Sequence, residues 1–206
     1  MVSDTIQFVF ENKIQKIRNA DSNKTILNYI RNDLKKIGTK EGCAEGGCGA
    51  CTIVLGELNK NKIIYKAINA CISFLPTLNG KHLILVEDLT NEKNKLHPVQ
   101  EAMVKFHGSQ CGFCTPGFTM SLFSMYKNHR TVNKEIIDES LSGNLCRCTG
   151  YRPIIDAAKS LNYKKDEDQF KKNQNKIFNL LKKIKKIDIE LNNKGKKYFA
   201  PKTILS

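Results

Sequence analysis

The chain has 206 residues, of which 40% are apolar and 26% are charged, with 8 cysteines and a formal net charge of +14. This composition is typical of one or two globular domains with a modest core, and it excludes a wholly disordered chain. The N-terminus lacks the pattern of a secretory signal, and no apolar run approaches the roughly 20 residues that span a bilayer. We therefore expect a cytoplasmic protein whose cysteines are metal ligands or redox thiols.

The positive charge is concentrated near the C-terminus. Residues 164–197 contain twelve lysines and five acidic residues, which accounts for half of the net charge. A solvated basic surface explains this distribution better than a nucleic-acid interface does. We expect neither nucleic acid nor a membrane as a partner.

The first part of the chain shows the patterns of a mixed α/β domain. Alternation of apolar and polar residues predicts strands over 5–9 and 13–17, joined by a turn at Glu11 and Asn12. A short helix follows, with Asp21 or Ser22 as its cap. Its apolar face consists of Ile26, Leu27, Ile30 and Leu34. Further strands are predicted over 52–55, 63–65 and 83–86, which gives an α+β pattern for residues 1–86.

From Pro98 onward the periodicity becomes helical. Helices are predicted to begin at Pro98, at Thr115, after Asn133 and after Tyr151. Four short helices in about seventy residues indicate a compact bundle. The polar stretch 87–96 separates it from the first domain, so we place the second domain at 87–163.

The tail has its own pattern. Apolar residues recur at helical spacing among the lysines: Phe170, Ile177, Leu181, Ile184, Ile187 and Leu191. This predicts an amphipathic helix that lies on a partner or on the bundle, in preference to a membrane surface.

Four cysteines form a first constellation. Cys43, Cys48 and Cys51 have the spacing C-x4-C-x2-C, and Cys71 is a distant fourth, as in plant-type [2Fe–2S] ferredoxins. Glycines fill the loop at 42, 46, 47 and 49, so the backbone can approach the sulfurs and its N–H groups can bond a cluster. Structural zinc usually takes paired C-x2-C motifs, and the four-residue gap is unusual for it.

The other four cysteines form a second constellation. Cys111 and Cys114 are followed by Cys146 and Cys148, a spacing that alone suits zinc about as well as an iron–sulfur cluster. The C-x-C pair is tight for one tetrahedral zinc ion. Both pairs also precede predicted helices, whose N-terminal dipoles stabilise thiolates. These two features favour the cluster.

Together, these motifs resemble the iron–sulfur portion of the xanthine dehydrogenase family of molybdenum hydroxylases. The matching stretches are residues 38–51, 96–100, 108–117 and 143–153, within a resemblance that covers roughly residues 5–160. The fold implied is α+β: a β-grasp [2Fe–2S] ferredoxin-like domain followed by a four-helix-bundle [2Fe–2S]-binding domain.

The resemblance also implies an electron relay. A purine is hydroxylated at a molybdopterin centre in a large partner subunit, and two [2Fe–2S] clusters pass the electrons toward FAD and NAD. The bundle cluster is expected next to the pterin, and the cluster of the first domain toward the flavin. Gln110 is a candidate cofactor-binding residue that offers its amide to a pterin edge, with bonding to the local backbone about equally favoured. We expect no catalytic residue in this chain.

A flavin domain follows the bundle in bacterial small subunits of this family. Residues 198–206 resemble its opening, and we expect no FAD pocket to form from them. Residues 164–197 would then be a lysine-rich helical linker to that domain.

Three alternatives stay open at this point: the iron–sulfur subunit of a related aldehyde oxidoreductase, a stand-alone ferredoxin-like carrier, and a zinc-binding module that uses the basic tail on nucleic acid. The four histidines, at 82, 97, 107 and 129, are expected to be surface or packing residues.

Overall fold

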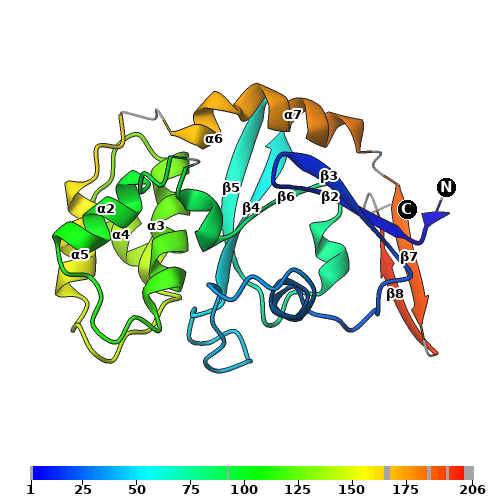
Figure 1. Cartoon of the computed structure of the whole chain (residues 1–206), viewed down its shortest axis with the longest axis horizontal. Helices are drawn as coiled ribbons and strands as arrows, with labels where there is room; N and C mark the ends of the chain where they lie inside the picture. Colours follow the sequence, from blue (N-terminus) through cyan, green and yellow to red (C-terminus); the bar gives the residue numbers. More distant parts are fainter. Residues whose placement is uncertain (1, 92, 165–167, 185–186, 194, 202–206) are drawn as a thin grey trace.

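The computed structural model describes residues 2–91, 93–164, 168–184, 187–193 and 195–201. A five-stranded sheet with the strand order β3-β2-β6-β4-β5 lies at its centre (Figure 1). Strands β2 and β6 are parallel, and the other neighbours are antiparallel. The strands are β2 (Thr5–Phe10), β3 (Lys13–Arg18), β4 (Thr52–Asn59), β5 (Lys62–Asn69) and β6 (His82–Ile84). All five predicted strands are therefore present. Strands β2 and β3 are each one residue longer than expected, β4 and β5 are longer by several residues, and β6 ends two residues early.

The sheet is buried on both faces because successive side chains of a strand point to opposite sides. Ile53 and Leu55 of β4 face one core, which they share with Ile26 of α1 (Ile26–Asn28) and Leu75 of η2 (Leu75–Leu78). Val54 faces the other core, which contains the bundle helices. Burial on both faces explains why β4 is apolar at consecutive positions. Helix α1, on one of these faces, continues as a single π-helical turn, η1 (Tyr29–Asp33).

The predicted four-helix bundle is confirmed. It consists of α2 (Pro98–Lys105), α3 (Thr115–Asn128), α4 (Lys134–Leu141) and α5 (Arg152–Ser160), and the short turn η3 (Val86–Leu89) precedes it. Every residue of α3 from Gly117 to Tyr126 is buried. The reason is that α3 packs against the other helices and also against strands β4 and β5.

The helix caps follow the predictions only in part. Asn133 caps α4, because its side chain accepts a hydrogen bond from the Ile136 amide at 2.9 Å. Helix α1 is capped by Thr25 and not by Asp21 or Ser22. The Asp21 carboxylate instead accepts from the Asn23 amide in the preceding turn. A short polar side chain can satisfy a turn as well as a helix, and sequence spacing alone does not separate the two.

The prediction of a helical linker over 164–197 is wrong beyond Lys183. The helices α6 (Gln169–Lys172) and α7 (Gln174–Lys183) are followed by a hairpin of β7 (Asp188–Asn193) and β8 (Lys196–Ala200). Strand β1 (Val2–Ser3) pairs with β7 in parallel and completes a three-stranded sheet. Ile189 and Leu191 are buried and alternate with polar neighbours, which is the period of a strand. The prediction of a helix through Leu191 overlooked this change from a helical period to the two-residue period of a strand.

The tail covers the sheet. Ile177, Leu181 and Ile184 are buried in the core that also contains Ile63 and Val54. In Figure 1, α6 and α7 run along the top of the sheet, beyond the bundle. The tail therefore packs on both parts of the fold: α7 lies on strands β2 and β5, and Phe170 of α6 packs against Phe123 of bundle helix α3. Residues 198–200 belong to β8, and 202–206 lie outside the described residues, so their origin in a flavin domain stays a prediction.

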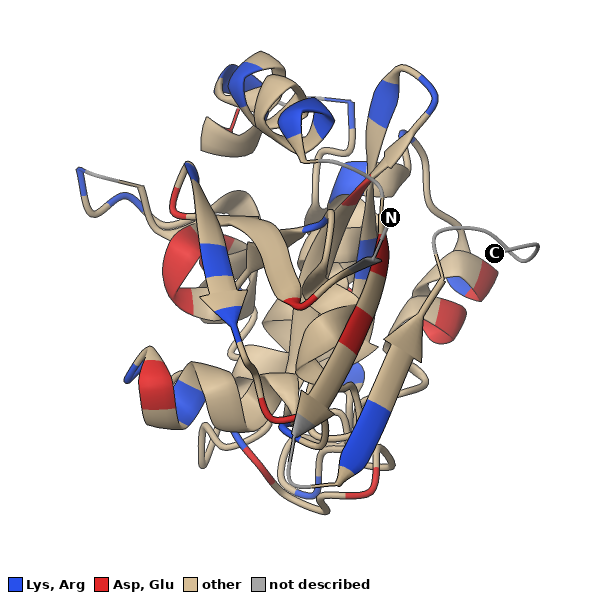
Figure 2. Ribbon diagram, turned by 90° about the vertical axis from the view of Figure 1, so that its right-hand side faces the viewer, with Lys and Arg blue, Asp and Glu red and all other residues tan. Residues whose placement is uncertain are grey.

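Charged side chains are spread over the surface. Figure 2 shows Lys and Arg on helices, strands and loops, with Asp and Glu between them. Among the described residues, no helix has the length and apolar character needed to cross a bilayer.

A buried ionic cluster fixes the start of the tail to the bundle. Asp168 lies 2.8 Å from Nε2 of His97 and 3.1 Å from Nζ of Lys127, and all three side chains are at most 3% exposed. Nδ1 of His97 accepts from the Val99 amide and so caps α2. His97 is a packing residue, as expected. Burial alone would raise the pKa of Asp168, but the His97 hydrogen bond and the Lys127 charge lower it to about 2.

We predict that Asp168→Asn lowers the free energy of unfolding by about 3 kcal/mol, because it removes the carboxylate that both His97 and Lys127 contact in a buried place. The matched control is Asp138→Asn, which breaks the exposed pair of Asp138 with Lys134 and should cost less than about 0.5 kcal/mol.

Urea unfolding at pH 7 measures both variants. Since the folded pKa of Asp168 is depressed, its contribution is complete above the unfolded value near 4 and disappears as the pH falls toward 2. Equal losses in the two variants at pH 7 would contradict a buried role for Asp168.

Candidate metal centres

The first cysteine set is assembled by the pairing of two strands. Cys51 immediately precedes β4, and Cys71 follows β5 by two residues. The register places Thr52 opposite Asn69, which brings both cysteines to the same end of the hairpin. Their Sγ atoms are 3.3 Å apart and buried.

The remaining two ligands of this set come from the loop before β4. Sγ of Cys43 accepts hydrogen bonds from the amides of Gly47 and Cys48, each at 3.3 Å. Backbone hydrogen bonds from Glu45 and Cys48 lower the pKa of Cys43 to about 7. Burial raises the pKa of Cys51 to about 12. The set therefore has an inner pair, Cys51 with Cys71, and an outer pair, Cys43 with Cys48, whose side chains also interact.

The second set lies where loops of the bundle meet. Cys114 is the N-cap of α3, with Cys111 three residues earlier. Cys146 and Cys148 lie in the loop between α4 and α5. The side chains of Cys114 and Cys146 interact, as do those of Cys111 and Cys148. Cys146 is buried, whereas Cys111 and Cys148 are exposed, so this set also has an inner and an outer pair.

Local hydrogen bonds hold the loop of Cys146. Its Sγ lies 3.2 Å from Oγ1 of Thr149, and its amide donates to the hydroxyl of Tyr151 at 3.0 Å. Desolvation would raise the pKa of Cys146, but the hydrogen bonds from Thr149 lower it overall. Burial raises the pKa of Cys114 to about 12. A metal that binds here must displace protons from the buried thiols.

The pairing of the sulfurs fits a two-iron cluster. The eight free cysteines interact as four pairs, two in each set. A [2Fe–2S] cluster needs four thiolates shared between two irons, hence two for each iron. A structural zinc ion needs four ligands that converge on one point. No group of three or more His, Cys, Asp or Glu in the described ranges could hold a single metal ion. The residues therefore fit two [2Fe–2S] clusters better than two zinc ions.

The two sets are neighbours. The amide of Leu145, which precedes Cys146, donates a hydrogen bond of 2.9 Å to the carbonyl of Cys48. Phe113, beside Cys114, also reaches the first loop, since a β-carbon added at Gly42 would lie 3.6 Å from its ring. The backbone of one ligand in the first set is thus bonded to the residue next to a ligand of the second.

The bundle and the first loop meet without room for side chains. A β-carbon at Gly117 of α3 would overlap the carbonyl oxygen of Gly49, and one at Gly49 would overlap the carbonyl oxygen of Gly143. Gly49 also has φ of +70°, which favours glycine. The amide of Asn144 fills the remaining space and bonds to Gly49.

Sequence reasoning found all eight cysteines but missed this junction. Asn144 lies within the matching stretch 143–153, but the sequence predicts no role for it, because nothing in the spacing separates it from the other polar residues. Gln110 is exposed immediately before Cys111, at the outer pair of the second set. Its binding to a pterin stays a prediction.

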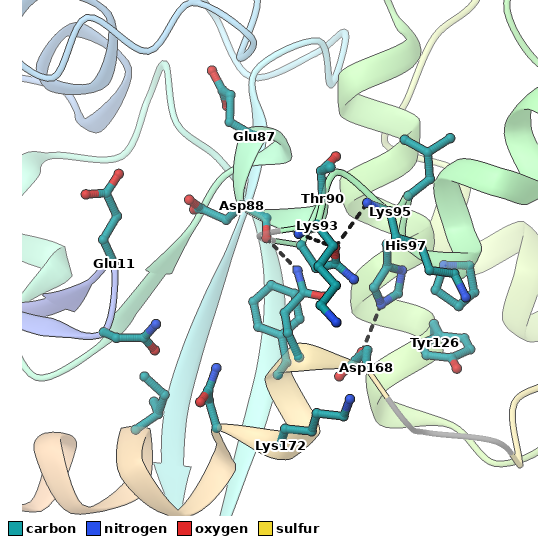
Figure 3. A pocket seen from close by; sticks show the side chains of 18 of the residues that line it. Glu11, Glu87, Asp88, Thr90, Lys93, Lys95, His97, Tyr126, Asp168 and Lys172 are labelled. Carbon is teal, nitrogen blue, oxygen red and sulfur yellow. Dashed lines mark hydrogen bonds and ion pairs between the residues drawn. The ribbon is translucent and has the colours of Figure 1, made fainter.

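A separate cavity of about 1030 Å³ contains none of the cysteines (Figure 3). Its walls come from the sheet, from the segment that leads into α2 and from α6 and α7. Burial raises the pKa of Asp88 in this wall to about 6, and the charge of Glu87 adds to the effect. Its lining mixes lysines with carboxylates.

We predict that Gly117→Ala weakens the junction and reduces cluster incorporation, because overpacking against backbone costs about 1–3 kcal/mol. The matched control is Gly143→Ala, since a β-carbon at Gly143 meets nothing within 4 Å. Iron content and thermal unfolding of the purified chains measure the effect. Normal stability and iron in Gly117→Ala would show that the close approach is not required.

Comparison with known proteins supports the cluster assignment. A model described as a 2Fe-2S iron-sulfur cluster binding domain matches residues 9–75, and one described as a [2Fe-2S] binding domain matches residues 85–159. Each match contains one complete cysteine set.

The curated relatives are much longer proteins. Xanthine dehydrogenase from Blastobotrys adeninivorans is 53% identical over 145 residues, which is 69% of this chain and 10% of that protein. Aldehyde oxidase 1 from Rattus norvegicus is 44% identical over 161 residues, 76% of this chain and 12% of that protein. The chain thus spans about a tenth of the length of these relatives.

Solved structures agree. The quinoline 2-oxidoreductase of Pseudomonas putida 86 matches with a TM-score of 0.63 and 29% identity, covering 78% of this chain and 93% of that one. The aldehyde oxidoreductase of Desulfovibrio gigas matches with a TM-score of 0.65 and 31% identity, covering 77% and 17% respectively. The chain belongs to the iron–sulfur domains of the xanthine dehydrogenase family of molybdenum hydroxylases.

Proposed function

We propose that this chain relays single electrons between two [2Fe–2S] clusters, one held by Cys43, Cys48, Cys51 and Cys71 and the other by Cys111, Cys114, Cys146 and Cys148. The observation that carries the proposal is the direct junction of the two cysteine sets, where the Leu145 amide bonds the Cys48 carbonyl. Each cluster, when bound, takes up and releases one electron. The protein holds the two sites side by side so that an electron moves between them.

The residues around the sulfurs prepare both sites for a negatively charged cluster. The amides that bond Cys43 stabilise its thiolate, and Thr149 does the same for Cys146. Of the inner pairs, Cys51, Cys71 and Cys146 are buried and Cys114 is half-buried, so these pairs would fix each cluster to the protein. The outer pairs are nearer to solvent, where a partner can approach.

The exposed outer pair of the bundle site supports an order for the relay. Cys111, Cys148 and Gln110 are all exposed at this end of the molecule. We propose that this surface faces a molybdopterin-binding subunit or domain, and that the first-domain cluster delivers electrons to a FAD-binding partner and from there to NAD. We place the substrate site in the molybdopterin-binding partner and not in this chain.

We propose a purine as the substrate of the whole enzyme and the cytoplasm as its location. The 53% identity to a xanthine dehydrogenase favours the purine, and the eight free cysteines favour a reducing compartment. An aldehyde is the second candidate, because aldehyde oxidase 1 is 44% identical over a similar range.

The purified chain should contain about four iron and four sulfide, as two clusters with four cysteine ligands each require. Cys43→Ser and Cys111→Ser should each halve both contents, since each removes a ligand of one site only. Chemical analysis with visible absorption measures this. Stoichiometric zinc without colour would rule out the relay and support a zinc-binding module.

The order of the relay is tested in a complex reconstituted with the molybdenum and flavin partners. Cys43→Ser should leave substrate reduction of the bundle cluster intact and slow electron delivery to the flavin, as followed by rapid-mixing absorption spectroscopy. Cys111→Ser should stop delivery at its source. The order is reversed if Cys111→Ser leaves flavin reduction intact while Cys43→Ser prevents substrate from reducing the bundle cluster.

A further inference from the structure

Asn144 has a side-chain amide whose hydrogen-bonding groups are all used in a buried place. The residue is 3% exposed. Its Oδ1 accepts from the hydroxyl of Ser121 at 2.6 Å. Its Nδ2 donates to the carbonyl of Gly49 at 3.0 Å and to Oγ1 of Thr52 at 3.2 Å. A buried amide with two donors and one acceptor satisfied is a strong local constraint.

Asn144 and its partners lie on three segments that carry the cysteines of the two sets. Gly49 lies in the first loop, between Cys48 and Cys51. Ser121 lies on α3, the helix that Cys114 caps. Asn144 itself precedes Cys146 by two residues. One side chain therefore connects the ligand-bearing parts of both sites.

We propose that Asn144 is a positioning residue that fixes the distance and orientation between the two iron–sulfur sites, and thereby sets the rate of electron transfer between them. This inference rests on the proposed function, because it assigns a task within the relay. Asn144 touches no ligand sulfur in the described structure, so its action is on the loops and not on either cluster directly.

The chemistry of the position requires an amide. An aspartate has the same shape but would present an oxygen where Nδ2 now donates, so it would repel the Gly49 carbonyl. It could bond Thr52 only if that hydroxyl gave up its own hydrogen bond of 2.7 Å to the Gly49 carbonyl. The close approach of Gly49 to Gly117 leaves no space for a larger side chain. The neighbouring bond from Leu145 to Cys48 depends on the same alignment of loops.

The chain offers a matched control. Asn128, at the other end of α3, also joins the bundle to the first domain by accepting from the Tyr65 amide at 3.1 Å and donating to the Tyr65 carbonyl. It lies on the same helix but contacts neither cysteine loop in the bonds that the structure gives it. Asn128→Asp removes a comparable bond between the domains.

The test reduces the full chain with dithionite and records the electron paramagnetic resonance of both clusters. In the wild type, we expect one well-defined magnetic interaction between the reduced clusters. In Asn144→Asp, we expect the magnetic interaction between the reduced clusters to be weaker or to show a distribution of strengths. We also expect slower electron exchange between the clusters. In Asn128→Asp, the interaction should match the wild type even if stability falls. A normal interaction in iron-replete Asn144→Asp overturns the proposal.

A second measurement is independent of the iron. Amide hydrogen exchange should show faster exchange at Leu145 and Thr52 in Asn144→Asp, since their amides bond the carbonyls of Cys48 and Gly49. In Asn128→Asp, these two amides should stay protected. Unchanged protection in Asn144→Asp overturns the positioning role, whatever the metal content. If the purified wild-type chain contained no iron, the proposed function would be refuted. The hydrogen-exchange result would still test whether Asn144 holds the two loops together.

Discussion

The backbone of Gly49 lies so close to Gly117 on one side and to Gly143 on the other that neither Gly49 nor Gly117 can carry a β-carbon. This close approach is the constraint on which the arrangement of the two cysteine sets depends. It brings the loop of the first set against the start of α3, where Cys114 caps the helix. Side chains at either position would separate the domains and with them the two sites. The hydrogen bond from the Leu145 amide to the Cys48 carbonyl lies next to this contact.

The rest of the fold supports that junction. Both faces of the central sheet are buried, one by α1 and one by the bundle with α7. Helix α3 packs on β4 and β5, the strands whose register also brings Cys51 beside Cys71. The ionic cluster of Asp168 with His97 and Lys127 fixes the tail over the same region. This packing holds the loops of the two cysteine sets against each other.

Much of this architecture could be predicted from the sequence. The cysteine spacing predicts the two ligand sets, because metal sites are recognisable from residue type and spacing, and each matched [2Fe–2S] domain contains one of the sets. The strands and the four helices followed from periodicity. The tail beyond Lys183 could not be read in this way, since Ile184, Leu191 and their neighbours fit a helical spacing while Ile189 and Leu191 also fit a strand. The pairing of β7 with β8 in a hairpin and with β1 in parallel decided between the two, and the spacing of the apolar residues does not reveal these partners.

The junction was also beyond sequence reasoning. Gly117 and Asn144 are separated along the chain from Gly49, and only the fold brings them into contact. The pairing of the sulfurs into inner and outer members likewise depends on burial, which separates Cys146 from Cys148 although they are two residues apart. Residue types therefore predict the chemistry of each site, but the burial of its cysteines and the residues around them are known only from the structure.

The central claim is that this chain carries two one-electron sites that exchange electrons. An anaerobic reductive titration of the purified chain, followed by visible absorption, tests it most directly. The account predicts uptake of about two electrons per chain, one for each cluster with four cysteine ligands, with bleaching of both clusters. Uptake of one electron or none per chain, in protein with its full metal content, would contradict it.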